Sequence, residues 1–346
     1  IGVDKYYFIL CITLMNMESE NYLNFENKFR GEREKILEIF NSYDSLIELA
    51  IEQDPSVNLV DIGCGRGEWL QKNRDKINEC IGIESDPSMI KVCRDNSLNV
   101  IEGDAIDKLS EFETGSVSII TIFHMIEHLD YYQLINLINQ CQRVLSDEGI
   151  LIMETPSIDN LIVSTNKFYI DHTHINPINP EAICFYLEQA GFNGIKSFYI
   201  NGGPLQDASH LKMTRILNGV AQDLCIISTK TKRKFDMIFT NNSQWQSNLN
   251  IGITTLEAAI DHDLKLESLI NGHEKSTEDL QKELQEQSSQ FNKDIFILNQ
   301  EISLSKEEIR LLKARLKYII YLSSILKLLM RPIFVLIKSV RKLILM

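Results

Sequence analysis

The sequence predicts an α/β fold with a doubly wound parallel sheet, and three observations support this. Short apolar segments alternate over residues 58–154 with segments whose apolar residues recur at helical spacing. The first apolar segment, 58–62, runs into Gly63-Cys64-Gly65-Arg66-Gly67, as a strand followed by a tight turn and a helix start would. The chain has 346 residues, 44% of them hydrophobic, which is enough to bury such a sheet and to add an accessory region.

The expected elements follow in chain order. Residues 22–53 carry apolar side chains near 3.6-residue spacing and predict helices. Strands are then expected at 58–62, 80–84, 100–102, 117–123 and 149–154, with helices at 67–77, 87–96 and 130–145 between them. A loop rich in Asn, Pro and His (155–180) precedes a helix at 180–190 and two last strands at 194–200 and 224–229. Strands that alternate with helices imply a parallel sheet whose ligands bind at the carboxyl ends of the strands.

The C-terminal third has a different character. A polar stretch at 232–253 is expected to be a linker, and no strand pattern recurs in the helical region 254–319. We expect Gly272 to interrupt the first helix of this region. From 284 to 319 apolar residues repeat in heptads, with a positions Ile295, Ile302, Ile309, Leu316 and d positions Leu284, Phe291, Leu298, Leu312, Ile319. Isoleucine at a with mostly leucine at d favours a parallel two-stranded coiled coil and hence a homo-oligomer. A helix packed on the first domain is the alternative.

The tail, 320–346, combines apolar and basic residues. Its cations Lys327, Arg331, Lys338 and Lys342 share one helical face, and the charge-free stretch Tyr318–Leu326 is too short to span a bilayer. This pattern predicts an amphipathic helix that lies on an anionic membrane surface. We therefore expect the protein to be cytoplasmic and peripherally attached to the inner face of the plasma membrane. A partner-binding or self-packing helix is the alternative.

Charge and cysteine content narrow the class of protein. Nine of the 35 Lys and Arg residues and none of the 48 Asp and Glu residues lie beyond residue 308, so residues 1–308 carry a formal charge of −22. Such an acidic body disfavours binding to nucleic acid. The seven cysteines are scattered without a C-x-x-C pair, which indicates a reducing compartment. Residues 1–16 are expected to be a leader or upstream sequence, and Met17 to open a first domain at 17–231.

The glycine turn predicts the ligand. Alternating glycines let the backbone bend sharply and approach a bound molecule closely. Asp61 is a poor neighbour for a pyrophosphate, and no Lys-Ser/Thr pair forms a P-loop, so a cationic or zwitterionic ligand is expected. An ordinary glycine turn is the alternative.

The run Asp61-x-Gly63-x-Gly65-x-Gly67 closely resembles the first motif of class I S-adenosylmethionine-dependent methyltransferases. The resemblance implies a Rossmann-like sheet of seven strands, the last antiparallel, and S-adenosylmethionine as cofactor. It also implies that Glu84 binds the ribose and that Asp104, in Gly103-Asp104-Ala105, binds the adenine. A solvated acid and an ordinary Gly-Asp turn are the alternatives. The cofactor-binding set expected on this basis is Asp61, Gly63, Cys64, Gly65, Gly67, Glu84, Asp104, Ala105, Phe123 and Arg30. Arg30 has two alternatives to a cofactor contact, an acidic sugar and a surface salt bridge.

A second motif, His124-Met125-Ile126-Glu127-His128, allows two interpretations. It matches the H-x-x-E-H pattern of zinc peptidases, in which two histidines bind the metal and the glutamate activates water. Against this, it directly follows a predicted buried strand, and the sequence offers no evident third ligand. A similar His-x-x-Glu-His-Leu occurs beside the methyl donor in many class I methyltransferases. We therefore expect no metal, and we expect Glu127 and His128 to orient the loop.

Further segments resemble methyltransferases associated with bacterial surface-polysaccharide (O-antigen) synthesis. They are Glu154-Thr155-Pro156-Ser157, the segment from Phe168 to Pro177, and Phe25-Glu26-Asn27-Lys28-Phe29-Arg30-Gly31. An imidazole suits the proton of a hydroxyl acceptor. The candidate catalytic residues are His174, which Asp171 is expected to hold, with His124 and His172 as alternatives. Loop histidines that merely support structure are the other interpretation.

These observations predict an enzyme that O-methylates a sugar of a lipid-linked surface polysaccharide, as a possible chain-end cap, at the cytoplasmic membrane face. Chain-terminating enzymes of some O-antigen systems resemble this architecture of coiled coil and membrane-seated tail. Two alternatives remain: a methyltransferase for a membrane quinone or lipid, and a non-catalytic coiled-coil scaffold. The sequence identifies neither the acceptor sugar nor the accepting atom.

Overall fold

A computed structural model describes residues 19–301 and 314–331 of the chain. Contacts divide the chain into two units, Ile1–Ile260 and Asp261–Met346, which are described separately here. The expected leader, residues 1–16, lies outside the described residues, as does most of the basic tail.

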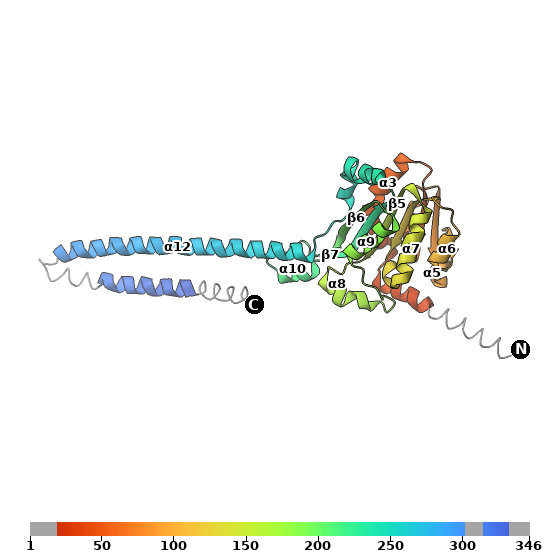
Figure 1. Ribbon diagram of the computed structural model, residues 1–346. Coiled ribbons are helices and arrows are strands. Elements are labelled where there is room, and N and C mark those ends of the chain that lie inside the picture. Colours follow the sequence, from red (N-terminus) through yellow and green to blue (C-terminus); the bar gives the residue numbers. More distant parts are fainter. Residues whose placement is uncertain (1–18, 302–313, 332–346) are drawn as a thin grey trace. The chain divides into compact units, whose positions relative to one another are not determined.

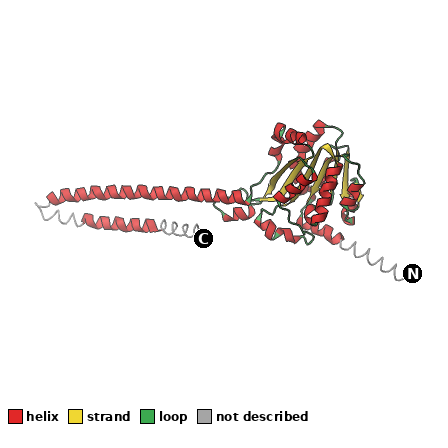
Figure 2. Ribbon diagram, viewed as in Figure 1, coloured by secondary structure: helices red, strands yellow, loops and turns green. Residues whose placement is uncertain are grey.

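The first unit contains one sheet of seven strands in the order β3-β2-β1-β4-β5-β7-β6 (Figures 1 and 2). The strands are β1 Asn58–Ile62, β2 Glu79–Glu84, β3 Val100–Glu102, β4 Val117–Phe123, β5 Leu145–Pro156, β6 Gly194–Gly202 and β7 Ala221–Thr229. Strands β1 to β5 pair in parallel, and β7 is antiparallel to both β5 and β6. The predicted doubly wound sheet with an antiparallel last strand is confirmed. The strand order reverses between β1 and β4, the position where such folds bind ligands.

Helices cover both faces of the sheet. They are α2 Arg33–Ile39, α3 Asp44–Gln53, α4 Glu68–Asn73, α5 Pro87–Asp95, α6 Ala105–Ser110, α7 Tyr131–Val144, α8 Leu161–Thr165, α9 Pro180–Ala190, α10 Met213–Asn218 and α11 Lys232–Asp236. Short helices of other types are η1 Phe40–Tyr43, η2 Ile126–His128, η3 Lys167–Ile170, η4 Met237–Asn241 and η5 Ser243–Asn248. Before α2, residues 19–29 are helical. This helix is separated from α2 near Gly31, whose φ is +105°, and the sequence did not predict where the helices in 22–53 would break.

The core consists of two layers because successive strand residues point to opposite faces. Leu59, Ile119 and Ile152 belong to the layer that contains η1, α3 and α4. Their neighbours Val60, Ile120 and Leu151 belong to the layer beneath α6, α7 and α9. With both faces buried, the strands are almost continuously apolar, and this made them recognisable in the sequence.

Helix starts follow local capping chemistry. Asp130 accepts from the backbone N–H of Gln133, and Gln133 reaches back to the backbone of Asp130, forming a capping box at the start of α7. Asn179 caps α9 with Pro180 in the first turn, and Gly191 ends that helix in the left-handed region. These caps fix the loops that lead from the strand ends into the helices.

Residues 232–253, expected to be a linker, are folded onto the first unit. They form α11, η4 and η5, and Ile238, Trp245 and Leu249 are buried in the first core layer. The Trp245 indole donates to the carbonyl of Ile238 at 3.0 Å. The stretch is polar overall, but a few large apolar side chains anchor it in the core. The average composition of about 20 residues did not reveal this packing.

A continuous helix, α12 Thr255–Glu301, begins in the first unit and continues into the second. Ala258 in its first turn is buried against Ile216 and Val220. Gly272 lies within this helix and does not interrupt it, contrary to our expectation, because glycine lowers helix stability by only about 1 kcal/mol. Residues 314–331 form another helix.

The coiled coil itself remains a prediction. Ile302, Ile309 and Leu312 of the heptad pattern lie outside the described residues. Leu284, at a d position, is 43% exposed in this single chain. Among the residues that the structure describes, no helix is both long enough and apolar enough to cross a bilayer.

Candidate active site

The glycine turn after β1 is open on one side only. Gly63, Gly65 and Gly67 all have positive φ, at 66°, 54° and 76°. A Cβ added to Gly67 would lie 2.5 Å from the Leu98 side chain, so that side of the turn is closed by packing. A Cβ on Gly65 would meet nothing nearer than Arg30 Nη1 at 3.8 Å. The turn therefore presents bare backbone toward Arg30, as the binding of a ligand requires.

Glu84, at the end of β2, is tied to this turn. One of its carboxylate oxygens accepts from the N–H of Gly65 at 2.8 Å, and the other accepts from Ser85 and Asp86 at 2.8 and 2.9 Å. Burial raises the pKa of Glu84, although these backbone donors oppose the shift. The structure brings the predicted ribose-binding acid beside the glycine turn.

Asp61 is a buried acid at the same strand end. Its carboxylate accepts from the Thr121 hydroxyl at 2.7 Å, and only 3% of the residue is exposed. Burial raises the pKa of Asp61 to about 7, with Thr121 and Arg30 opposing the shift. A positive charge nearby would favour the ionised form of such a buried carboxyl. Together with the open backbone at Gly65, Asp61 fits a ligand that carries an ammonium or sulfonium group.

The other predicted cofactor residues lie near the turn in different surroundings. Asp104 caps α6 by accepting from Ile106 at 2.8 Å and Asp107 at 3.2 Å, both through one carboxylate oxygen. Cys64, Ala105 and Phe123 are buried. The Phe123 ring packs against Phe40, Tyr43 and Trp69. These contacts give Asp104 and Phe123 structural roles, and their contact with a cofactor stays a prediction.

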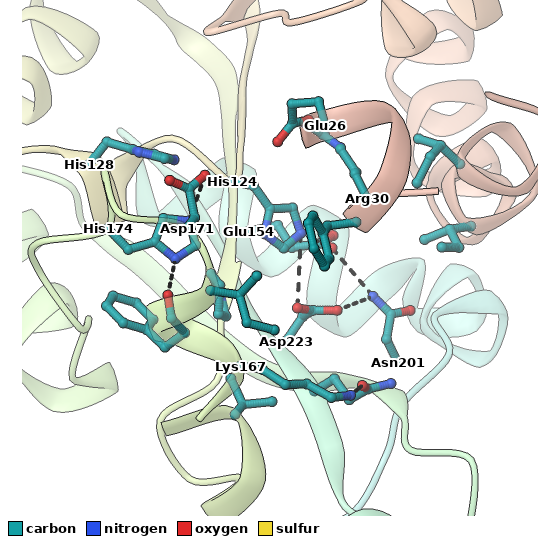
Figure 3. A pocket seen from close by; sticks show the side chains of 18 of the residues that line it. Glu26, Arg30, His124, His128, Glu154, Lys167, Asp171, His174, Asn201 and Asp223 are labelled. Carbon is teal, nitrogen blue, oxygen red and sulfur yellow. Dashed lines mark hydrogen bonds and ion pairs between the residues drawn. The ribbon is translucent and has the colours of Figure 1, made fainter. Parts of the chain in front are cut away.

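A cavity of about 690 Å³ contains the remaining candidates (Figure 3). It is lined by Phe25, Glu26, Phe29, Arg30, Ile36, Ile39, Phe40, His124, His128, Glu154, Pro156, Val163, Lys167, Phe168, Ile170, Asp171, His174, Asn201, Gly202, Gln222, Asp223 and Asn250. Arg30 contacts Glu26 at 3.4 Å in the cavity wall and also faces Gly65, so it lies between the cavity and the turn. His172, an alternative catalytic candidate, is exposed and does not line the cavity.

His124 is held by acids at one side of this cavity. Its backbone adopts φ 52°, rare for a non-glycine residue, and its N–H donates to the Glu154 carbonyl at 2.8 Å. The ring lies 3.3 Å from the Glu154 carboxylate, 3.5 Å from Glu127 and 3.9 Å from Asp223. Burial opposes protonation, but these acids raise the pKa of His124 well above its ordinary value. A protonated imidazole cannot accept a proton, so the geometry favours an ion-pairing role for His124.

The acids beside His124 form a polar wall with one amide. Asn201 donates to Glu154 at 3.3 Å and to Asp223 at 2.8 Å (Figure 3). The Tyr43 hydroxyl also donates to Glu154. Burial raises the pKa of Asp223 to about 6. Sequence reasoning missed Asn201, Tyr43 and Asp223, because they come from β6, η1 and β7, and only the folded sheet brings them together.

His174 occupies the opposite side, with His128 and Asp171 (Figure 3). Its Nδ1 lies 2.7 Å from the Phe168 carbonyl, which can only accept, so Nδ1 carries the proton and Nε2 keeps its lone pair. Nε2 lies 3.9 Å from Asp171, too far for a hydrogen bond. Asp171 is held instead by the backbone and hydroxyl of Thr173, at 2.8 and 2.6 Å, and by Tyr22 at 3.1 Å.

His128 approaches His174 from a different loop. Its Nδ1 lies 2.8 Å from the Thr173 hydroxyl, and the two imidazole rings are 4.6 Å apart. Burial lowers the pKa of His128 and favours the neutral ring. His124 and His128 thus have different partners, and Ile126–His128 is a short 3-10 helix. The two histidines do not form the pair that a zinc peptidase requires.

The chain is similar to known methyltransferases. The sequence profile of a family described as a methyltransferase domain matches residues 32–197. The chain is 31% identical to a solved SAM-dependent methyltransferase from Archaeoglobus fulgidus, with a TM-score of 0.52, over 60% of this chain and 98% of that chain. A possible histamine N-methyltransferase from Thermotoga maritima also matches, with 18% identity, a TM-score of 0.43 and coverage of 61% and 98%. A search of curated proteins found no match.

Proposed function

The chain belongs to the S-adenosylmethionine-dependent methyltransferases, and we propose that it methylates a hydroxyl group of a sugar in a lipid-linked surface polysaccharide. S-adenosylmethionine is the cofactor, and it supplies a methyl group activated by a sulfonium. The protein has to bind both molecules, align them and remove the hydroxyl proton.

The residues around the glycine turn fit this cofactor. The open backbone at Gly65 and the carboxylates of Asp61 and Glu84 would hold it, with Arg30 at the boundary to the cavity. Asp61 offers a negative charge to the cationic part of the cofactor. Glu84 offers carboxylate oxygens, which suit the hydroxyls of a ribose.

The lining of the cavity supports a sugar as the acceptor. The amide side chains of Asn201, Gln222 and Asn250 line the same cavity as the carboxylates of Glu154 and Asp223, and Asn201 donates to both acids. Such groups both donate and accept hydrogen bonds, as recognition of several hydroxyls requires. Phe25, Phe29 and Phe168 supply apolar surface for the faces of a sugar ring. This combination of an amide and acid wall with an imidazole is the observation that carries the proposal.

His174 is the group best placed to take the proton. Its Nδ1–H is fixed by the Phe168 carbonyl, so the lone pair of the neutral ring is on Nε2, and the residue lines the cavity. Once protonated, the imidazole would be stabilised by Asp171 and Glu127, each 3.9 Å from Nε2. Both carboxylates are therefore positioned to favour proton transfer without blocking it.

The test is methyl transfer from isotopically labelled S-adenosylmethionine to polysaccharide isolated from cells that lack the enzyme. We expect label in the glycan and none in a membrane quinone or lipid fraction. His174→Asn should lower kcat by a factor on the order of 10² to 10⁴, with unchanged cofactor affinity, while the exposed control His172→Asn stays active. Label in the quinone or lipid alone would replace this function with the alternative.

The C-terminal region supports two further parts of the proposal, an oligomer and a membrane attachment. The heptads of α12 favour a two-stranded coiled coil of two copies of the chain. In the helix at 314–331, Ile320, Leu328 and Leu329 are 62, 70 and 64% exposed, which suits an interfacial helix with Lys327 and Arg331 at anionic lipids. Attachment at the inner leaflet would raise the effective concentration of a lipid-linked acceptor.

A further inference from the structure

Three side chains at the His174 side of the cavity form a cluster that the proton-transfer role does not explain. They are Glu127, His128 and His174, whose carboxylate and ring atoms lie within 4.8 Å of one another. Glu127 is completely buried, and its Oε1 has no hydrogen-bond partner among the described residues. A buried carboxylate oxygen that accepts no hydrogen bond is costly even beside the His124 ring at 3.5 Å, so the arrangement requires an explanation.

The two carboxylate oxygens of Glu127 have different surroundings: Oε1 has imidazole neighbours at ion-pair distance but no hydrogen bond. The other oxygen, Oε2, accepts from the Thr155 hydroxyl at 2.9 Å. The nearest nitrogens to Oε1 are His124 Nδ1 at 3.5 Å and His174 Nε2 at 3.9 Å, both beyond a good hydrogen bond. The backbone carbonyl of Glu127 accepts from Ile175 and Asn176 at 3.0 Å, which fixes the loop of His174 against η2.

Both imidazoles are oriented as metal-binding imidazoles usually are. A ligating histidine commonly donates its other N–H to a carbonyl or carboxylate, which sets the tautomer. His174 donates from Nδ1 to the Phe168 carbonyl. The Thr173 hydroxyl donates to Asp171, so it accepts from His128 Nδ1. Each ring therefore has a lone pair on Nε2, and each is held by an outer partner.

We propose that Glu127, His128 and His174 bind a divalent transition-metal ion that in turn binds the acceptor sugar. Two imidazoles and one carboxylate suit Zn²⁺, Mn²⁺, Fe²⁺ or Co²⁺ better than Mg²⁺, which prefers oxygen ligands. Three protein ligands leave coordination positions open toward the cavity, as in catalytic metal sites. The carboxylate of Asp171, 3.9 Å from His174 Nε2, would attract the cation. Protonated His124 would repel it, so Asp171 offsets part of that repulsion.

This inference deepens the proposed function and rests on it. A hydroxyl bound to the cation ionises more readily: its O–H bond breaks, the electron pair stays on the metal-bound oxygen, and the proton passes to water. The cation would then replace His174 as the group that activates the acceptor, because one lone pair cannot hold both a metal and a proton. Neighbouring sugar hydroxyls could occupy two open positions and orient the ring.

The site differs from the zinc-peptidase pattern and from our expectation of no metal. In that pattern His124 and His128 would be the ligands and Glu127 the base. Here Glu127 is a ligand, His124 is outside the set, and the third ligand comes from a loop 46 residues further along the chain. This explains why no third ligand was evident in the sequence.

The experiment is a binding titration of the full-length protein after treatment with a chelator. Mn²⁺ is the probe, followed by electron paramagnetic resonance, and Zn²⁺ is added in competition. We expect one site per chain, with affinity reduced on the order of 100-fold or more in Glu127→Gln and in His128→Asn. Thr173→Ala, which removes the hydroxyl that contacts both His128 and Asp171, should weaken binding by about 10-fold to 100-fold. The exposed loop variant His172→Asn should bind as the unmodified protein does.

Cofactor binding by each variant, measured by calorimetry, serves as the folding control. If Mn²⁺ and Zn²⁺ do not bind, or bind equally to folded Glu127→Gln or His128→Asn, the metal site is wrong. Labelled methyl transfer by the chelated enzyme would in that case leave the proposed function intact, with His174 as the base. Loss of methyl transfer to every glycan, with or without metal, would instead overturn the proposed function.

Discussion

At the residue scale, Asp61 connects stability, pH and cofactor binding. Its pKa of about 7 in the folded protein exceeds the ordinary value of 3.8, so the folded state binds more protons than the unfolded state between these values. The free energy of unfolding of the cofactor-free protein should therefore fall as pH rises from about 4 to about 7. A shift of this size corresponds to on the order of 4 kcal/mol.

The substitution Asp61→Asn removes this pH dependence. The variant should be more stable than the unmodified protein at pH 8 and similar to it at pH 4, as measured by denaturant unfolding. It should bind S-adenosylmethionine more weakly at pH 8, because the negative charge that meets the cofactor is lost. A variant of equal or lower stability at pH 8 would show that folding does not raise the pKa of Asp61.

Two glycines of the turn should respond differently to alanine. Both Gly65→Ala and Gly67→Ala place a side chain at positive φ, which costs about 1 kcal/mol. At Gly67 the new Cβ also overlaps Leu98 at 2.5 Å and Cys93 at 2.8 Å, so a further 1–3 kcal/mol of overpacking is expected. At Gly65 the Cβ enters open space on the cofactor side.

Thermal unfolding and calorimetry distinguish the two effects. Gly67→Ala should lower Tm more than Gly65→Ala does. Gly65→Ala should remain folded and lose cofactor affinity. If Gly65→Ala binds the cofactor normally, the open side of the turn is not the binding surface.

Where a motif is contiguous, the sequence predicted which residues lie together at the strand end, while their contact with a cofactor stays a prediction. Asp61, the three glycines and Glu84 lie together as expected, because a strand end and its turn are set by local sequence. The sequence could not predict that His124 is surrounded by acids. Its partners Glu154 and Asp223 belong to β5 and β7, and their proximity depends on the order of strands in the sheet.

At the scale of elements, strands were predicted more accurately than connections. The predicted bounds of β1, β3 and β4 agree with the structure. β1 and β4 are mostly apolar and almost wholly buried, whereas β3 is a short, partly exposed edge strand that ends at Gly103. β5, β6 and β7 extend beyond their predicted ends, where polar residues such as Asp223 still pair in the ladder. Polar side chains show where the hydrophobic core ends, but a strand continues for as long as its backbone has hydrogen-bond partners in the neighbouring strand.

The segment 232–253 offers a test at this scale. Trp245→Ala removes a buried ring that packs against Phe239 and Phe198, with ring centroids 5.4 and 6.2 Å apart. We expect the free energy of unfolding to fall by about 3–5 kcal/mol. The neighbouring exposed residue provides the control, since Gln244→Ala should change stability by less than about 0.5 kcal/mol. If both substitutions had equally small effects on stability, the segment would not be packed on the first unit and would be a linker, as the sequence predicts.

At the scale of the whole molecule, the contacts within one chain do not explain the stability of the long helix α12. Its 47 residues span about 70 Å, and Leu269, Leu280 and Leu284 are 39, 46 and 43% exposed. Helices of this length owe their stability mainly to packing of an apolar face. A second copy of the chain would supply that packing through the heptads.

Light scattering of the full chain should therefore give the mass of two copies. The double substitution Leu284→Asp and Phe291→Asp, at two d positions, should convert it to a single copy while cofactor binding is retained. Ser289→Asp, next to the a position Ser288 and off the heptad seam, is the matched control and should leave the dimer intact. A single-copy mass for the unmodified chain would exclude the coiled-coil dimer.

The central claim is that the chain transfers a methyl group from S-adenosylmethionine to a sugar hydroxyl, and one measurement tests it most directly. Purified enzyme is incubated with the labelled cofactor and the surface glycan from cells lacking the enzyme, and the glycan is then examined by mass spectrometry. The account predicts one added methyl group on a sugar oxygen, and its loss with His174→Asn. An unmodified glycan, with the label on a quinone or lipid in the same extract, would contradict it.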